Sequence, residues 1–156
     1  MHNQQAFLAG NTGAVIVAAG FGSRMGSGIP KQFQALAGRP VLLWSLDAML
    51  QCEEIVAVAV VVPASERARA MALLPGNPRL VFVDGGATRT ESVRNGVKAL
   101  EGKGLAKVLI HDAARPGLSP AVVRELTAAL DGADAAAPAL PVTDALKDIG
   151  DKVMQT

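Results

Sequence analysis

Two cations follow a glycine-rich turn close to the N-terminus of this chain. Residues 18–26 read Ala-Ala-Gly-Phe-Gly-Ser-Arg-Met-Gly and come directly after an apolar, strand-like run. Gly20 and Gly22 allow backbone N–H groups to approach phosphate oxygens closely. Arg24 offers a planar fork of donors, and Lys31 offers a compact point charge. A buried strand, a turn of small residues and two cations in this order predict a cradle for a triphosphate.

The same glycines have a second interpretation, a dinucleotide-binding turn. That turn has the pattern G-x-G-x-x-G and runs directly into a helix. Here Gly20, Gly22 and Gly26 read G-x-G-x-x-x-G. Pro30 would interrupt a helix that began at Gly22, and the next predicted strand ends in Pro63 rather than in an acidic residue. The residues favour the phosphate cradle, with a dinucleotide turn or a purely structural turn as alternatives.

A second glycine-rich segment precedes the start of a predicted helix. Gly85 and Gly86 come before the sequence Thr-Arg-Thr-Glu, which has the pattern of a capping box. We interpret the two glycines as a backbone surface on which a nucleobase or ribose lies. Arg89 and Ser92 would face the same cleft from the first helical turn. The alternative is an ordinary turn followed by a helix cap.

A third motif, His-Asp-Ala-Ala-Arg-Pro at 111–116, directly follows an apolar strand. Asp112 is well placed to bind Mg²⁺, which prefers carboxylate and phosphate oxygens. Arg115 would clamp a second phosphate, or else Asp112 caps a helix and pairs with Arg115. For His111 we expect a structural role rather than that of a general base. Together the motifs predict in-line attack of one phosphate on the α-phosphorus of a nucleoside triphosphate.

Strand-like and helix-like stretches alternate, which predicts a three-layer α/β/α fold with a Rossmann-like, mostly parallel sheet of the nucleotidyltransferase type. Strands are expected at 14–18, 55–62, 80–83, 107–110 and 133–139, and helices at 40–51, 64–74, 88–100 and 119–130. Ligands bind beyond the carboxyl ends of parallel strands. We therefore expect the polar loops at 20–31, 84–92, 111–116 and 141–144 to meet at one edge of the sheet.

The composition is that of a globular protein. Half of the 156 residues are hydrophobic, 19% are charged and the net charge is +1. Aromatic residues make up 3%, which argues against binding of single-stranded nucleic acid. No run reaches the roughly 18 apolar residues that span a bilayer, and no basic region marks a signal peptide. Cys52 is the single cysteine, which excludes an internal disulfide. We expect a cytoplasmic enzyme that binds neither nucleic acid nor membrane, with a disordered tail at 1–12 and one domain at 13–156.

The ordered set of motifs resembles the 2-C-methyl-D-erythritol 4-phosphate cytidylyltransferase family over about residues 13–147. The glycine-rich turn with Pro30-Lys31-Gln32 is common to many nucleotidyltransferases, whereas the set that includes His-Asp-Ala-Ala-Arg-Pro is more specific. The resemblance implies transfer of CMP from CTP to 2-C-methyl-D-erythritol 4-phosphate, in non-mevalonate isoprenoid biosynthesis. It also implies Mg²⁺ or another divalent cation as cofactor.

The resemblance assigns roles to individual residues. Arg24 and Lys31 would be catalytic, and Asp112 with Arg115 would bind the acceptor and, through Asp112, the metal. The nucleotide site would consist of Ala18, Ala19, Gly20, Gly22, Gly85, Gly86, Ala87, Arg89, Ser92 and Ala113. Thr143 and Ala145 would bind substrate. Ala145 replaces the family's usual Thr, and Ala87 stands where members often carry a polar or acidic residue.

Family members continue past the end of this sequence, so we expect the C-terminal part of the domain to be missing here. That part would complete a dimerising arm after Pro141, so a homodimer is expected. Some bacteria fuse this domain to a cyclodiphosphate synthase. Two other functions stay open. One is a nucleotidyltransferase for another small phosphorylated acceptor, such as a sugar phosphate or a pterin cofactor, and the other is a nucleotide-binding fragment without turnover.

Overall fold

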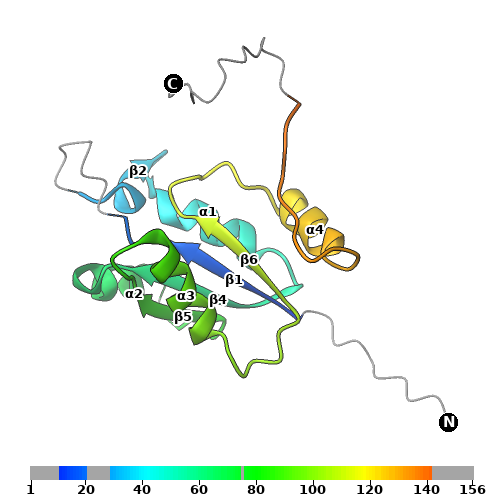
Figure 1. Ribbon diagram of the computed structural model, residues 1–156. Helices are drawn as coiled ribbons and strands as arrows, with labels where there is room; N and C mark the ends of the chain where they lie inside the picture. Colours follow the sequence, from blue (N-terminus) through cyan, green and yellow to red (C-terminus); the bar gives the residue numbers. More distant parts are fainter. Residues whose placement is uncertain (1–10, 21–28, 75, 142–156) are drawn as a thin grey trace, which may run out of the picture.

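The computed structural model of this chain describes residues 11–20, 29–74 and 76–141. Its centre is a four-stranded parallel sheet with the strand order β5-β4-β1-β6 (Figure 1). The strands are β1 Thr12–Val17, β4 Ile55–Val62, β5 Leu80–Asp84 and β6 Lys107–Asp112. A short antiparallel pair, β2 Ala35–Leu36 and β3 Arg39–Pro40, forms a separate hairpin. β1 and β4 lie inside the sheet and are covered on both faces, which explains their continuous apolar sequences.

Helices cover both faces of the sheet. They are α1 Val41–Leu50, α2 Arg67–Leu73, α3 Arg89–Ala99 and α4 Pro120–Ala129, with 3-10 turns η1 Lys31–Phe33 and η2 Ala64–Glu66. Successive strand residues point to opposite faces, and the buried apolar residues accordingly form two clusters. Ile16 of β1 packs in the cluster shared with α1, α2 and α4, while Val15 packs in the cluster on the α3 side. The predicted three-layer α/β fold is confirmed.

Helix α3 lies unusually close to the sheet, and its sequence shows why. A Cβ on Gly96 would overlap the side chain of Val15 and come within 2.9 Å of Val61 Cγ2, so a glycine is needed at the contact. The start of the helix is fixed by the predicted capping box. Thr88 Oγ1 accepts a hydrogen bond from Glu91 N, and Glu91 Oε2 accepts one from Thr88 N. The first turn of α3 is therefore held rigidly at the carboxyl edge of the sheet.

Most predicted elements agree with the structure, and β4 has the predicted bounds. The predicted helix at 64–74 is divided into η2 and α2, and Pro40 is the N-cap residue of α1 rather than its first helical residue. β1 begins at Thr12, while residues 1–10 of the expected tail lie outside the described part. None of the described helices is long and apolar enough to cross a membrane.

The predicted strand at 133–139 is wrong. This run is exposed along its length and has no strand assignment, and none of the described strands pairs with it. Its residues are alanines apart from Asp134 and Pro138. Alanine and aspartate are poor strand formers, alanine buries little apolar area, and proline has no N–H for a ladder. An apolar composition without large β-branched side chains was therefore misleading.

Candidate functional site

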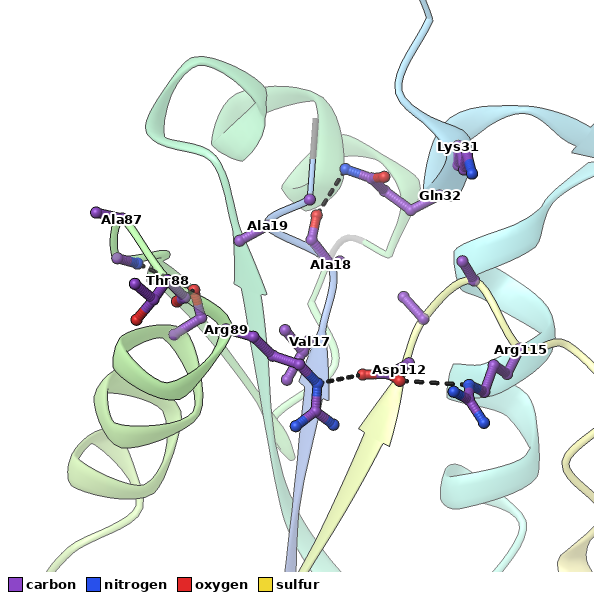
Figure 2. A pocket seen from close by; sticks show the side chains of 15 residues that line it. Val17, Ala18, Ala19, Lys31, Gln32, Ala87, Thr88, Arg89, Asp112 and Arg115 are labelled. Atoms are coloured by element: carbon purple, nitrogen blue, oxygen red, sulfur yellow. Dashed lines mark hydrogen bonds and ion pairs between the residues drawn. The ribbon is translucent and has the colours of Figure 1, made fainter. Parts of the chain in front are cut away.

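A cavity of about 810 Å³ lies at the carboxyl ends of β1 and β6, beside the N-terminus of α3 (Figure 2). Three of the predicted loops meet there, from parts of the sequence that are far apart. The predicted site residues that line it are Ala18, Ala19, Gly20, Lys31, Gly86, Ala87, Arg89, Ser92, Asp112, Ala113 and Arg115. Val17, Gln32, Thr88 and Ala114 also line it and were not assigned to the site from the sequence.

The remaining predicted site residues fall elsewhere. Gly22, Arg24, Thr143 and Ala145 lie outside the described residues. Gly85 lies beneath the cavity rather than on its wall. Its N–H donates to Val62 O at 2.8 Å, and a Cβ at this position would overlap Ala19 Cβ. Gly85 therefore lets the loop after β5 pack against the end of β1.

The loop at 85–88 is shaped from within by a buried hydroxyl. Ser92 is 2% exposed, and its Oγ donates to Thr88 O at 3.0 Å while accepting from Gly86 N at 3.1 Å. A Cβ on Gly86 would overlap the side chain of Glu91. This wall of the cavity is therefore built from close backbone packing. The Ser92 hydroxyl already has hydrogen-bond partners within the loop.

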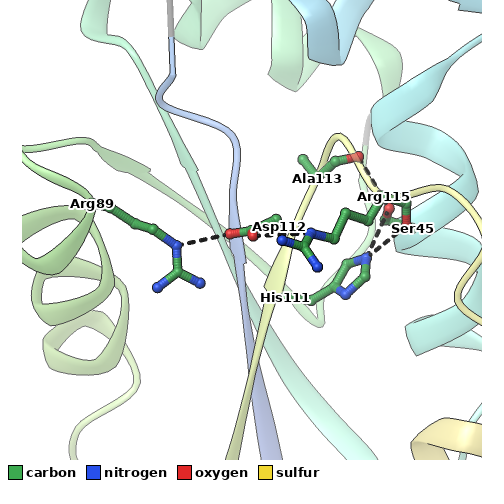
Figure 3. Close-up of polar contacts among 6 residues, drawn as sticks. All are labelled: Ser45, Arg89, His111, Asp112, Ala113 and Arg115. Atoms are coloured by element: carbon green, nitrogen blue, oxygen red, sulfur yellow. Dashed lines mark hydrogen bonds and ion pairs between the residues drawn. The ribbon is translucent and has the colours of Figure 1, made fainter. Parts of the chain in front are cut away.

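The opposite wall carries the charged side chains of Asp112 and Arg115, and Arg89 reaches Asp112 from the start of α3. Asp112 Oδ1 lies 3.0 Å from Arg89 Nε, and Asp112 Oδ2 lies 3.3 Å from Arg115 Nε (Figure 3). Among the described residues, neither arginine forms a second ion pair. The Nη groups of both arginines are therefore available to bind an anion. Asp112 and Arg115 do pair, as one alternative predicted, but Asp112 does not begin a helix, because the next helix starts at Pro120.

Lys31 stands at the far side of the cavity, at the start of η1 (Figure 2). The neighbouring Gln32 is 3% exposed, and its Nε2 donates to Ala18 O at 2.6 Å. This hydrogen bond fastens η1 to the end of β1. Three cations and one carboxylate among the described residues thus surround the cavity, a balance that favours an anionic ligand.

A half-buried histidine and a buried serine support the third loop. His111 Nε2 lies 3.0 Å from Arg115 O and 3.3 Å from Ser45 Oγ, and the Ser45 hydroxyl donates to Ala113 O at 3.2 Å. Burial lowers the pKa of His111 below its usual value of 6.5, against the raising effects of the Arg115 carbonyl and Asp112. Ser45 lies on α1, 68 residues from Ala113, and no local sequence pattern pointed to it.

Metal binding by protein side chains alone has no support in the described part of the chain. No group of three or more His, Cys, Asp or Glu side chains there could hold a metal ion. Asp112 is the acidic side chain on the cavity wall. A single carboxylate is nevertheless sufficient for Mg²⁺ when substrate phosphates supply further oxygens.

Comparisons with known proteins identify the family of this chain. The sequence model of the family "2-C-methyl-D-erythritol 4-phosphate cytidylyltransferase" matches residues 12–156. A relative of that name from Cereibacter sphaeroides is 49% identical over 137 residues, which cover 86% of this chain and 60% of the relative. A bifunctional enzyme IspD/IspF from Ruegeria is 47% identical over 134 residues, 85% of this chain and 34% of that protein.

Solved structures show the same fold. The crystal structure of 4-diphosphocytidyl-2C-methyl-D-erythritol synthase from Anaerococcus prevotii has a TM-score of 0.79 and 28% identity, and the match covers 92% of this chain and 60% of that one. The chain therefore spans about 60% of the length of the cytidylyltransferases it matches. The matched residues include all three motifs that line the cavity. The chain belongs to the 2-C-methyl-D-erythritol 4-phosphate cytidylyltransferase family.

Proposed function

We propose that this chain forms the nucleotide-binding core of an enzyme that transfers CMP from CTP to 2-C-methyl-D-erythritol 4-phosphate. The observation that carries the proposal is the cavity at the carboxyl ends of the parallel strands, which is lined by the three cations Lys31, Arg89 and Arg115 and by a single carboxylate. A site of this charge and size suits two phosphorylated ligands at once. The family membership supports the identity of both substrates.

The reaction needs no nucleophile from the protein. An oxygen of the acceptor phosphate attacks the α-phosphorus of CTP, the bond to the α–β bridging oxygen breaks, and that oxygen leaves with the electron pair as pyrophosphate. Catalysis then depends on position and on charges fixed near the oxygens that become more negative. Lys31 is the described cation that we assign to this task, and Arg24 would join it.

The two walls of the cavity divide the substrates between them. The 85–88 loop and the N-terminal turn of α3 would bind the cytidine, by backbone groups and by close shape. Arg115 would bind the acceptor phosphate, since its exposed Nη groups form a fork that matches two phosphate oxygens. Asp112 would hold both arginines in place through their Nε atoms.

Mg²⁺ fits this donor set as a proposed cofactor. Asp112 would hold the ion together with phosphate oxygens, and the bound ion would neutralise charge on the triphosphate. Both oxygens of Asp112 already face an arginine, so metal binding at this carboxylate would compete with at least one of those ion pairs.

We also propose that the protein forms a homodimer and is cytoplasmic. Leu140, at the start of the segment that the family resemblance identifies as a dimerising arm, is 90% exposed, and a homodimer would bury such a side chain. A cytoplasmic location suits an enzyme that uses CTP. Sedimentation of the protein over a range of concentrations would test the dimer.

Pyrophosphate release tests the proposed activity. It is measured with CTP and Mg²⁺ in the presence of methylerythritol phosphate, of a sugar phosphate, or of no acceptor. We expect release with methylerythritol phosphate, at a kcat/KM well above that for the sugar phosphate. A higher kcat/KM with the sugar phosphate would assign another acceptor. CTP binding by calorimetry without release from any mixture would leave a nucleotide-binding role alone.

A further inference from the structure

The loop that carries Arg115 has no regular secondary structure, yet its backbone is fastened at four points. Ala113 N donates to Val17 O and Arg115 N donates to Asp112 O, each at 3.0 Å. The other two points are the carbonyl oxygens of Ala113 and Arg115, which accept from Ser45 and His111. Neither Ser45 nor His111 lines the cavity, so this fastening comes from outside the substrate site.

The hydrogen-bond partners determine where the proton of His111 lies. A carbonyl oxygen only accepts, so the 3.0 Å contact with Arg115 O requires a proton on Nε2. Ser45 has one hydroxyl proton, which it donates to Ala113 O, so it can only accept from Nε2. Neutral His111 is therefore the Nε2–H tautomer. Nδ1 is then the nitrogen that can accept a proton, and because the ring does not line the cavity, His111 is not placed to act as a general base.

The fastened backbone has a direct effect on Arg115. The side chain of this arginine is 78% exposed, and its one described contact is the ion pair with Asp112. An exposed arginine has many rotamers, and ordering it is unfavourable in entropy. The fastened backbone holds the Arg115 Cα at a fixed distance from Asp112, so less conformational entropy is lost when a ligand orders the side chain. Figure 3 shows the guanidinium of Arg115 between the carboxylate of Asp112 on one side and His111 with Ser45 on the other.

We propose that Ser45 and His111 are positioning residues for the acceptor phosphate, which they serve by fixing the carbonyl groups of Ala113 and Arg115. The inference rests on the proposed function for the identity of that phosphate. It assigns a role to a residue on α1 in the opposite layer from α3, far in sequence from each of the three motifs. CTP contacts the other wall and should be little affected.

Enzyme kinetics on three variants test the proposal. His111→Leu and Ser45→Ala each remove one donor, whereas His111→Gln keeps an amide N–H that can reach Arg115 O. We expect His111→Leu to raise KM for methylerythritol phosphate roughly tenfold, because a displaced Arg115 would lose about one hydrogen bond to the charged ligand, with KM for CTP changed less than about twofold. Ser45→Ala should also raise KM for methylerythritol phosphate. His111→Gln should keep this KM close to the wild-type value.

Thr127→Val is the matched control. Thr127 is also a buried hydroxyl, and it donates to Val123 O inside α4 without contacting the loop. Its removal should lower thermal stability but leave both KM values unchanged. Equal increases in KM for CTP and acceptor in His111→Leu would overturn the proposal, because general loosening of the fold has that effect. Failure of His111→Gln to recover acceptor binding would also contradict it.

A second measurement separates this inference from the proposed activity. ¹⁵N NMR of His111 reports the tautomer directly. Amide hydrogen exchange of Ala113, Ala114, Arg115 and Gly117 reports the order of the loop in the wild type and in Ser45→Ala. We expect the Nε2–H tautomer and faster exchange of these amides in the variant. If the wild type released no pyrophosphate with methylerythritol phosphate, the proposed function would fail while these results still decided the inference. An Nδ1–H tautomer, or unchanged exchange, would overturn it.

Discussion

The two walls of the cavity are built in opposite ways. On the α3 side, a Cβ at Gly85 or Gly86 would overlap neighbouring atoms. The Ser92 hydroxyl there forms its hydrogen bonds with the backbone of the 85–88 loop. On the β6 side lie Asp112 and the guanidinium of Arg115, whose side chain is 78% exposed, and Arg89, 62% exposed, reaches Asp112 from the start of α3. One wall is fixed by shape, and the other is fixed by charge.

In the proposed reaction two ligands bind side by side, and this difference assigns each of them to one wall. A wall with no spare volume selects a flat group such as a base, because any shift of its backbone would create overlaps. A wall of ion pairs can exchange partners, because a phosphate can replace a carboxylate as the acceptor of an arginine fork. We therefore expect nucleotide binding to change the structure little, and acceptor binding to change the contacts of Asp112.

The largest effect should come from Lys31, which belongs to neither wall. Lys31→Ala should lower kcat by about 10²–10³, comparable to the loss of one preorganised donor in a transition state. Steady-state kinetics would measure it. Lys98→Ala is a suitable control, since Lys98 is an exposed lysine at the other end of α3. A rise in KM for CTP with an unchanged kcat would show that Lys31 binds the ground state and transition state equally.

Removal of Arg115 tests the charged wall. Arg115→Ala should raise KM for the acceptor by a factor equivalent to about 1.5–3 kcal/mol, with CTP affinity nearly unchanged. Calorimetry with CTP and kinetics with the acceptor would separate the two ligands. Arg89→Ala is the comparison, because Arg89 pairs with the same carboxylate from the start of α3 and should affect CTP more. If Arg115→Ala weakened CTP as much as the acceptor, the assignment of the walls would be reversed.

An added side chain at Gly85, beneath the cavity, tests the wall fixed by shape. The new methyl group of Gly85→Ala would overlap Ala19 and lie 3.2 Å from Ser92 Oγ. Overpacking of this kind destabilises by about 1–3 kcal/mol, so the melting temperature should fall and CTP affinity with it. Gly132→Ala is the control, since no described atom lies within 4 Å of its added Cβ. Unchanged CTP affinity in Gly85→Ala would show that this wall adapts.

The sequence predicted the parts of the molecule that depend on local patterns. The capping box at Thr88, the apolar strand β4 and the placement of loops beyond the strand ends all follow from neighbouring residues. Contacts between distant segments were not predictable in this way. Gln32 binds a carbonyl of β1, and Ser45 binds one in the loop after β6, but nothing nearby in sequence marks either side chain as a support.

The smallest expected effect is a dependence of stability on pH, and it concerns the support beneath the charged wall. Burial lowers the pKa of His111, with Arg115 acting in the same direction and the Arg115 carbonyl and Asp112 opposing it. The unfolded chain, with a histidine pKa near 6.5, therefore binds a proton more readily than the folded chain.

The sign of the effect follows from that difference. Where the unfolded state binds more protons, stability rises with pH, so His111 destabilises the fold as pH drops from about 6.5 through its folded pKa. Above 6.5 the contribution is constant. Thermal melting of the wild type and of His111→Gln across pH 5 to 8 would measure it. The wild type should lose stability faster than the variant as the solution becomes more acidic, since the variant lacks the titrating ring. Parallel curves would mean that the ring accepts a proton equally well in both states, and the charged wall would then rest on a support that is open to solvent.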